Sequence, residues 1–295
     1  MKQGTDVTGE LLKAVSRSFY LTIRFLPREM RPAVALGYML ARATDSVADT
    51  SLADELARAR ALSMMAEAIA GGEVEGLSSV LSNEMAPAQQ NPAERTLLER
   101  FGECLDALQT FPESQLILLR KVLSTIINGQ LWDISYFREH ASVDSDEETK
   151  RYAYSVAGCV GEFWTELGYA TMGEQFCVES RKDLMRQAGI RYGIGLQLIN
   201  ILRDCEEDAA RGRSYLSSEP QKWLNRAERY MDDGIDYSLR LGTFRLRFAS
   251  VLPALIGKET LRLLRGQAKG RVKIPRRRVY ACMLRAVFRC LHRKA

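Results

Sequence analysis

The sequence predicts an all-α protein, and three observations lead to this prediction. Apolar residues recur at steps of three and four along most of the 295 residues, which is the period of an α-helix. No Asn-Gly or Asp-Gly pair stands between two alternating runs, so the signals for β-hairpins are nearly absent. Prolines fall between the periodic stretches, where helices begin and end. We therefore expect about ten helices in a single domain over residues 1–295.

The helical period is strongest in five stretches. They are residues 11–26, 33–48, 55–70, 114–137 and 182–209. The prolines that punctuate such stretches are Pro27, Pro32, Pro112, Pro220, Pro253 and Pro275. Residues 71–94 are the least periodic part of the chain, which predicts an excursion over the surface. Within the periodic stretches, residues 122–132 and 193–202 carry few charges on any face, which predicts central helices that are buried or line a cavity.

The composition limits the classes of function. Six cysteines share no Cys-x-x-Cys spacing and only two histidines occur, so a zinc site is not expected. Scattered cysteines in a chain of this length indicate buried thiols in a reducing cytoplasm. No apolar run is long enough to span a membrane and the polar N-terminus does not resemble a signal peptide, so we expect a cytoplasmic protein.

Two carboxylate pairs are the candidate site for a metal. Asp45 and Asp49 are four residues apart, and so are Asp204 and Asp208. On a helix this spacing puts both side chains on one face, where like charges repel unless a cation lies between them. Oxygen ligands alone are suited to Mg²⁺. Each pair also follows an apolar stretch and has an arginine beside it, a combination that points to a diphosphate with an apolar tail.

At these residues the chain resembles the squalene/phytoene synthase family. The resemblance lies in four blocks: SRSFYLTIRFLP (16–27), ARATDSVADT (41–50), YAYSVAGCVGEFW (152–164) and LQLINILRDCEEDAARGRSYL (196–216). The last block is the most specific of the four. The resemblance implies an isoprenoid synthase bundle of helices around a deep apolar central cavity. It also implies head-to-head joining of two prenyl diphosphates with Mg²⁺.

The resemblance assigns roles to individual residues. The metal ligands are Asp45, Asp49, Asn200, Asp204 and Asp208, of which the four aspartates act in catalysis. Tyr152 lies near the reacting carbons. The residues expected to bind substrate are Ser16, Arg17, Ser18, Arg42, Val156, Ala157, Gly158, Gly161, Gln197, Asn200, Arg203, Arg213 and Tyr215. The small residues among them leave room for a prenyl chain; taken alone, VAGCVG is also typical of a close contact between two helices. Glu207 is a further candidate for assisting a metal, and Cys205 is expected in the core.

Two features place the chain nearer to squalene synthases than to phytoene synthases. Ser46 follows Asp45, where phytoene-type members usually have a second acid. The stretch KGRVKIPRRRVY, residues 269–280, resembles an element of squalene synthases that is linked to NADPH, and it would bind the cofactor through Lys273 and Arg276. The expected reaction joins two farnesyl diphosphates through presqualene diphosphate and then reduces the product to squalene. Dehydrosqualene, presqualene diphosphate and phytoene synthase are the alternatives, and a non-catalytic assembly-factor homologue is a distant one.

The C-terminal segment 261–295 carries twelve Lys or Arg residues and no acid, although the whole chain has a net charge of only +5. Such a segment predicts a polyanionic partner. Its last part is basic and amphipathic, so we expect peripheral contact with an anionic membrane at the inner face. A solvated basic tail is the alternative. No element that reads nucleic acid is recognisable, so nucleic acid is not an expected partner.

Overall fold

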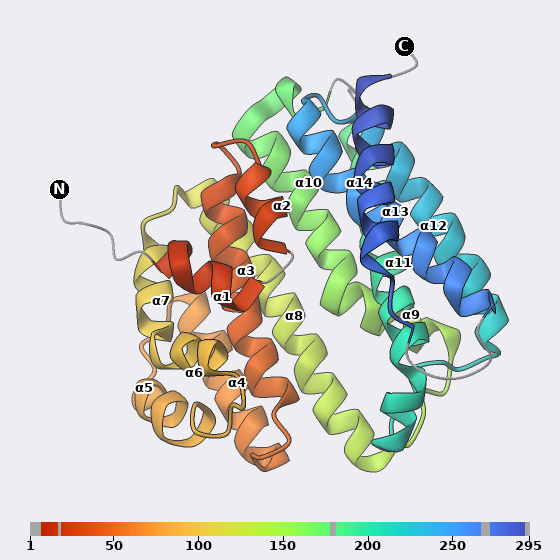
Figure 1. The fold of residues 1–295 in the computed structure, drawn as a ribbon. Coiled ribbons are helices and arrows are strands. Elements are labelled where there is room, and N and C mark those ends of the chain that lie inside the picture. The colour runs from red at the N-terminus through yellow and green to blue at the C-terminus, as the bar shows by residue number, and fades with distance from the viewer. Residues whose placement is uncertain (1–6, 17–18, 178–180, 267–271, 293–295) are drawn as a thin grey trace. The chain divides into compact units, whose positions relative to one another are not determined.

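The computed structural model describes residues 7–16, 19–177, 181–266 and 272–292. All regular elements in this part of the chain are helical, and its only β-type pairs are two isolated bridges, so the all-α prediction is confirmed. The chain forms two compact units, Met1–Ser135 and Tyr136–Ala295. Figure 1 colours the first unit red to yellow and the second green to blue. The prediction of a single domain around a central cavity stays a prediction.

The first unit is built around helix α3 (Arg31–Asp49), which contacts α1, α2, α4, α6 and α7. Eleven of its residues are buried, and Pro32 stands in its first turn, where a missing N–H costs nothing. The other helices of this unit are α1 (Leu12–Ser16), α2 (Phe19–Phe25), α4 (Glu55–Ala70), α5 (Leu77–Ser79), α6 (Pro92–Glu99), α7 (Phe101–Gln109) and most of α8 (Glu113–Glu139). Two π-helical segments, Val7–Leu11 and Val80–Met85, complete it.

The prediction of a surface excursion over residues 71–94 is wrong. This stretch contains α5, the π-helical segment Val80–Met85 and the start of α6, and it buries Leu77, Val80, Leu81 and Met85. These helical segments are too short to show a helical period in the sequence, although their apolar residues belong to the core. Asn91 caps α6 by accepting a hydrogen bond from the backbone N–H of Ala93.

The second unit is built around helix α11 (Lys182–Ala210), which contacts α9, α10, α12 and α13. Its helices besides α11 are α9 (Asp146–Ala153), α10 (Cys159–Met172), α12 (Pro220–Arg240), α13 (Phe244–Gly266) and α14 (Arg276–Leu291). A π-helical turn, Tyr154–Gly158, joins α9 to α10, and a short 3₁₀ turn, Gly173–Gln175, follows α10. The expectation that residues 193–202 form part of a central helix is confirmed, because α11 has neighbours on several sides.

Proline positions follow the prediction with one exception. Pro220 begins α12 and Pro275 precedes α14. Pro253, however, lies inside α13, so its use as a helix boundary was wrong. A proline inside a helix removes one backbone hydrogen bond, and the helix continues here because its buried residues on both sides of Pro253, such as Val251 and Leu255, keep it packed in the unit.

Candidate active site: two carboxylate pairs on two central helices

The first carboxylate pair lies in the last turns of α3, the central helix of the first unit. Asp49 is the last residue of α3 and is exposed, whereas Asp45 is half-buried. The C-terminal end of a helix carries the negative end of the helix dipole, so two carboxylates there are unfavourable in addition to their mutual repulsion. The two carboxylates therefore lower the stability of the metal-free protein and favour binding of a cation.

Gln130 of α8 holds Asp45 in place. Its Nε2 donates a hydrogen bond of 2.6 Å to Oδ1 of Asp45. The pKa of Asp45 is raised to about 7, chiefly because burial disfavours the charged form and also because Asp49 is close; Arg42 and the Gln130 hydrogen bond act in the opposite direction. Gln130 is itself buried, and its Oε1 has no hydrogen-bond partner. Oε1 of Gln130 therefore lacks a donor, and a cation beside Asp45 would offset the burial and repulsion that raise its pKa.

Arg42 lies one helical turn before Asp45, where a diphosphate-binding arginine was predicted. Its Nη2 is 3.4 Å from Oε1 of Glu94, at the start of α6. Its buried Nε has no hydrogen-bond partner. Arg42 is therefore positioned by an acid far away in the sequence, and it keeps one donor for another ligand.

The remaining predicted residues of the first unit belong to the N-terminal block. Ser16 is buried, and its hydroxyl donates a hydrogen bond of 2.5 Å to the carbonyl oxygen of Leu12. Nearby, the ring of Phe19 stacks on Tyr38 of α3 with centroids 5.3 Å apart. Arg17 and Ser18 lie outside the described residues, so their predicted contacts with substrate stay predictions.

The second carboxylate pair lies near the end of α11, the central helix of the second unit. Arg203 forms two hydrogen bonds with its neighbour Asp204, 3.0 Å from Nε to Oδ1 and 2.5 Å from Nη2 to Oδ2. This bond raises the pKa of the Arg203 guanidinium. Asp208 lies in the last turn of α11, and its backbone carbonyl accepts hydrogen bonds from the N–H groups of Arg211 and Arg213. Asp204 thus has an arginine counter-ion as its chain neighbour, whereas the hydrogen bond to Asp45 comes from a neutral amide.

Two predicted amides lie on the same helix as the second pair. Gln197 and Asn200 precede Asp204 by seven and four residues, spacings that place all three on one face of α11. Nδ2 of the exposed Asn200 donates to Oε1 of Gln197 over 3.4 Å. Cys205, expected in the core, is exposed, which corrects that expectation; the other five cysteines are buried.

The oxygen-only donor set fits Mg²⁺. Nowhere in the described part of the chain do three His, Cys, Asp or Glu side chains come together as a complete metal site. Mg²⁺ is usually bound by one or two carboxylates, and waters and substrate phosphates supply the remaining oxygens. Each pair can therefore hold a Mg²⁺ ion that a diphosphate completes, and the ion would offset the charge on Asp45.

An aromatic cluster of the second unit gathers three of the predicted residues. Tyr152 of α9 stacks on Tyr215 with ring centroids 4.7 Å apart. Phe137, near the end of α8, packs edge-on against Tyr215 at 4.8 Å, and the guanidinium of Arg213 lies 5.9 Å from the Phe137 ring centre. Sequence reasoning missed Phe137. An aromatic residue shortly before the third sequence block was the only signal, and it does not distinguish Phe137 from its neighbour Tyr136.

The segment that follows α11 carries Arg213 and Tyr215, and backbone hydrogen bonds fix it. Ser214 donates to the carbonyl oxygen of Ala141 over 2.9 Å, and Val143 donates to that of Ser214 over 3.0 Å. The hydroxyl of Thr149 donates to the carbonyl oxygen of Tyr215 over 2.9 Å. Asp146 then accepts hydrogen bonds from Ser217 and Ser218, at 2.8 and 3.0 Å.

Two of the predicted small residues have a packing role. A Cβ on Gly161 would lie 2.0 Å from the backbone oxygen of Gly189, and one on Gly158 would lie 2.9 Å from Ile194. Both glycines therefore let α10 and the turn before it contact α11 closely, and the space beside them is filled. Substrate contact through Val156 and Ala157 stays a prediction.

Glu162 is a buried acid that sequence reasoning did not single out. It accepts a hydrogen bond of 2.7 Å from the hydroxyl of Tyr154 and pairs with Arg186 of α11 at 2.9 Å. Burial and the bond to Glu162 raise the pKa of Tyr154. These contacts link the π-helical turn Tyr154–Gly158, which begins two residues after Tyr152, to α11.

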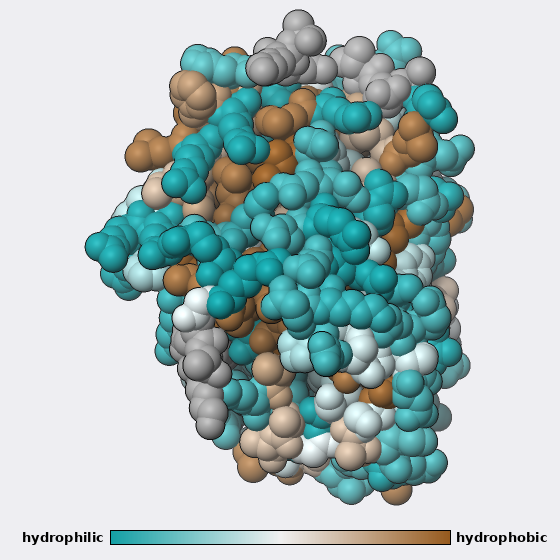
Figure 2. Space-filling view, turned by 90° about the vertical axis from the view of Figure 1, so that its right-hand side faces the viewer, coloured by the Kyte–Doolittle hydropathy of each residue, from teal (hydrophilic) through white to brown (hydrophobic). Residues whose placement is uncertain are grey.

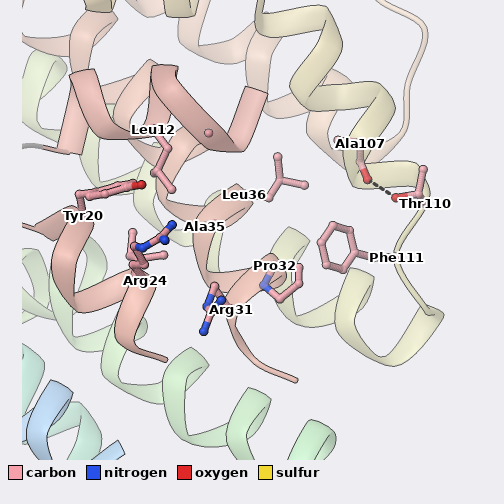
Figure 3. A pocket seen from close by; sticks show the side chains of 12 residues that line it. Leu12, Tyr20, Arg24, Arg31, Pro32, Ala35, Leu36, Ala107, Thr110 and Phe111 are labelled. Carbon is pink, nitrogen blue, oxygen red and sulfur yellow. Dashed lines mark hydrogen bonds between the residues drawn. The ribbon is translucent and has the colours of Figure 1, made fainter. Parts of the chain in front are cut away.

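Other predicted residues lie apart from this cluster. Arg276 is the first residue of α14 and Lys273 lies three residues before it; both are exposed, and their binding of NADPH stays a prediction. A pocket of about 280 Å³ in the first unit contains none of the predicted residues. Figure 3 shows it between α2, α3 and α7, with Tyr20 and Arg24 on one side and Phe111 across from them.

Curated relatives include two kinds of enzyme. The chain is 28% identical to the bifunctional lycopene cyclase/phytoene synthase of Pyrenophora tritici-repentis, over 78% of this chain and 36% of the relative. It is 29% identical to the squalene synthase of Schizosaccharomyces pombe, over 71% of this chain and 43% of the relative. The aligned region thus spans well under half of these relatives.

Solved structures agree on the fold. TcSQS, solved in complex with a ligand, aligns over 98% of this chain and 90% of its own, with a TM-score of 0.76 at 21% identity. Squalene synthase HpnC from Alicyclobacillus acidocaldarius aligns over 91% of this chain and 95% of its own, with a TM-score of 0.60 at 18% identity. The squalene/phytoene synthase family description matches residues 12–225. This match covers most of the chain and both carboxylate pairs, so the chain belongs to the squalene/phytoene synthase family.

Proposed function

We propose that this protein is a prenyltransferase that joins two farnesyl diphosphates head to head, and that it reduces the product to squalene. The observation that carries the proposal is the carboxylate pair with an adjacent arginine near the end of each central helix, α3 and α11. Two carboxylates at the end of a helix repel each other and oppose the helix dipole, so each pair favours binding of a cation. The squalene/phytoene synthase family supplies the chemistry that explains why they are present.

The protein's own residues bind the diphosphates and position the chains. Asp45, Asp49, Asp204 and Asp208 would hold Mg²⁺, and Asn200 would assist the second pair. Mg²⁺ stabilises the negative charge of a departing diphosphate. The guanidinium groups of Arg42, Arg203 and Arg213 bind phosphate oxygens, and they compensate charge that develops on the leaving group.

Tyr152 and Tyr215 form the aromatic part of the site. Their stacked rings present an apolar surface to a prenyl chain, while their hydroxyl groups can orient a diphosphate or accept a proton. Because Tyr215 is buried and its backbone is held by Thr149, its ring cannot rotate away without disturbing α9. The cluster thus excludes water from part of the site, as a reactive allylic cation requires.

The choice of squalene rests on two features. Ser46 takes the position at which phytoene-type members carry a second acid, and its hydroxyl is tied to the backbone oxygen of Arg42 at 2.9 Å. It therefore adds no metal ligand to the first pair. Lys273 and Arg276 are exposed and can pair with the 2′-phosphate of NADPH.

Phytoene synthesis from a C20 substrate is the second candidate. The observation in its favour is that several curated relatives, including the one from Pyrenophora tritici-repentis, are bifunctional lycopene cyclase/phytoene synthases. A structural relative is a dehydrosqualene synthase, with a TM-score of 0.64 over 96% of this chain. Dehydrosqualene synthesis would differ from squalene synthesis only in the last step.

Product analysis tests the proposal. Purified protein is incubated with Mg²⁺ and either farnesyl or geranylgeranyl diphosphate, with and without NADPH. Squalene formed from the C15 substrate only when NADPH is present is the expected result. Formation of phytoene from the C20 substrate would show that the second candidate, phytoene synthesis, is the activity. Dehydrosqualene or presqualene diphosphate, unchanged by NADPH, would exclude the reductive step, and no product from either substrate would indicate a non-catalytic homologue.

The expected contact with an anionic membrane concerns another surface, on α14, and the chemistry above does not depend on it. No helix in the described residues is both long enough and apolar enough to cross a bilayer.

A further inference from the structure

Helix α14 has two different faces, and one of them is packed. Cys282, Ala286 and Cys290 are buried and follow one another at steps of four, so they form one stripe. This stripe lies on α13, where the thiol of Cys282 is 3.7 Å from the backbone oxygen of Leu255. The packing fixes the rotation of α14 about its own axis and therefore decides which side chains face outward.

The outward face of α14 is apolar. Its exposed large residues are Tyr280, Leu284, Val287, Phe288 and Leu291, which we call the apolar row. Their exposed fractions run from 36% at Val287 to 73% at Leu284. At about 100° per residue they fall within roughly a third of the helix circumference. Five of the twelve exposed large apolar residues in the described chain thus lie on this one helix of 16 residues.

This concentration is unusual for the protein surface. The face shown in Figure 2 is mostly hydrophilic, with apolar side chains gathered in patches. Single exposed apolar residues need no explanation, but a continuous row at helical spacing marks a surface that binds an apolar partner. The described residues of this unit leave the row uncovered.

Basic side chains flank the apolar row. Arg276 and Arg277 open α14, and Arg285 and Arg289 lie beside the row on the side of a groove formed with α12 and α13. This groove has a volume of about 420 Å³. The described residues provide no carboxylate partner for Arg285 or Arg289.

The acids of the groove are already neutralised by other bases. Glu228 pairs with Arg265 at 2.8 Å, and Asp232 pairs with Lys258. Glu259 pairs with both Arg262, at 3.0 Å, and Arg278. The charges of Arg285 and Arg289 are therefore in excess, and the groove beside the apolar row is net positive. An anion that reaches the groove would meet two guanidinium groups without displacing an ion pair.

We propose that α14 docks on an anionic lipid bilayer, with the apolar row entering the interface and Arg285 and Arg289 contacting lipid phosphates. A helix that combines an apolar face with flanking arginines lies in the plane of the headgroups and binds by buried apolar area together with charge. A second copy of the chain fits less well. Face-to-face packing of two apolar rows would bring the same unpaired arginines close together. The proposal is independent of the proposed enzymatic reaction.

Sedimentation with vesicles tests this docking, with the full chain. The vesicles contain phosphatidylcholine alone or with about 30% phosphatidylglycerol. We expect the protein to sediment with the anionic vesicles at least about tenfold more strongly than with the neutral ones, and less so when salt is raised. The variant L284S/F288S should lose about tenfold or more of this binding, and R285Q/R289Q about tenfold. All four side chains lie on α14 outside its packed stripe, so the fold should be kept; a thermal melt checks this.

The matched control is L52S/L56S, which removes two apolar residues of similar exposure, 66% and 67%, from the first unit. It should bind anionic vesicles as the unchanged protein does. Absence of binding to anionic vesicles, or equal binding by L284S/F288S, would overturn the proposal. So would a dimer in light scattering that L284S/F288S converts to a monomer without any vesicle binding, because a second copy would then cover the row.

Discussion

The two carboxylate pairs have the same spacing on central helices, yet their charges are handled differently. Asp45 of the first pair accepts a hydrogen bond from a neutral amide, Gln130, and the nearby Arg42 pairs with Glu94. Asp204 of the second pair is bound in a two-fold contact by its own neighbour, Arg203. Asp45 is therefore half-buried beside a neutral donor, whereas Asp204 is bound by a guanidinium group before any ligand binds.

This difference indicates that the two pairs gain unequally from a metal. A cation at the first pair relieves the burial and repulsion that raise the pKa of Asp45 to about 7. At the second pair a cation must share Asp204 with Arg203, or displace it. We therefore expect the first pair to bind Mg²⁺ more tightly, and the second to depend more on the diphosphate that Arg203 can also bind.

The largest expected effect comes from removing one charge from each pair. Asp45→Asn and Asp204→Asn should each lower kcat/KM by about a thousandfold or more, because the leaving diphosphate loses a metal. Their effects on the fold should have opposite signs. Without metal, Asp45→Asn should raise the melting temperature, whereas Asp204→Asn should lower it by leaving Arg203 unpaired. Product assays and thermal melts measure both, with the exposed Asp106→Asn as control.

The comparison would fail if both variants changed the metal-free melting temperature in the same direction. Near-normal turnover in either variant would remove that pair from the site altogether.

Gly161→Ala tests whether the second unit depends on close packing beside its site. The new Cβ would lie 2.0 Å from a backbone oxygen of α11, so the helices must separate. We expect a loss of about 3 kcal/mol in the free energy of unfolding, which is a fall of roughly 5–10 °C in melting temperature. Gly102→Ala is the control, because a Cβ there has no neighbour within 4 Å and should stabilise α7 by about 0.5–1 kcal/mol. An unchanged melting temperature with lost activity would instead assign Gly161 to substrate binding.

Gln130→Leu sharpens the comparison on the side of the first pair. Leucine keeps most of the volume but removes both the donor to Asp45 and the unpaired Oε1. We expect the Mg²⁺ concentration for half-maximal rate to rise about 10- to 100-fold while the rate at saturating Mg²⁺ stays close to normal. Gln115→Leu, on the same helix, is the control. A variant with an unchanged Mg²⁺ requirement would show that Gln130 has no part in the site.

The smallest expected effect concerns Asp146, which holds the segment carrying Arg213 and Tyr215. Its pKa is lowered to about 2 by Lys222 and by hydrogen bonds from Ser217 and Ser218. Because the pKa is lower in the folded protein, the Asp146 carboxylate stabilises the fold at pH values above 3.8, its pKa in the unfolded chain. This contribution is lost as the pH falls toward 2. Asp146→Asn should lower the melting temperature by a few degrees at pH 7 and by less near pH 2. An equal decrease at both pH values would contradict the assignment.

Local spacing predicted much of this arrangement. Residues four apart on a helix must share a face, so the two carboxylate pairs and the Gln197, Asn200 and Asp204 face could be predicted without coordinates. The close helix contact at Gly158 and Gly161 was one of two open interpretations, and the structure supports it.

Partners distant in the sequence could not be predicted. Nothing near Arg42 indicates Glu94, and nothing near Asp45 indicates Gln130, 85 residues later. A single sequence gives no information on which helices meet. The one signal was Gln130 itself, a polar residue in the apolar stretch 122–132, where an unpaired amide would be costly. Similarly, the aromatic contact between Phe137 and Tyr215 depends on how α8 and the segment after α11 pack.

The contact between Arg203 and Asp204 has a consequence for a cell that is short of magnesium. Because the two residues are chain neighbours, the guanidinium is a tethered counter-ion whose local concentration never falls. The end of α11 should therefore keep its shape through metal starvation, and activity should return as soon as magnesium does, without refolding.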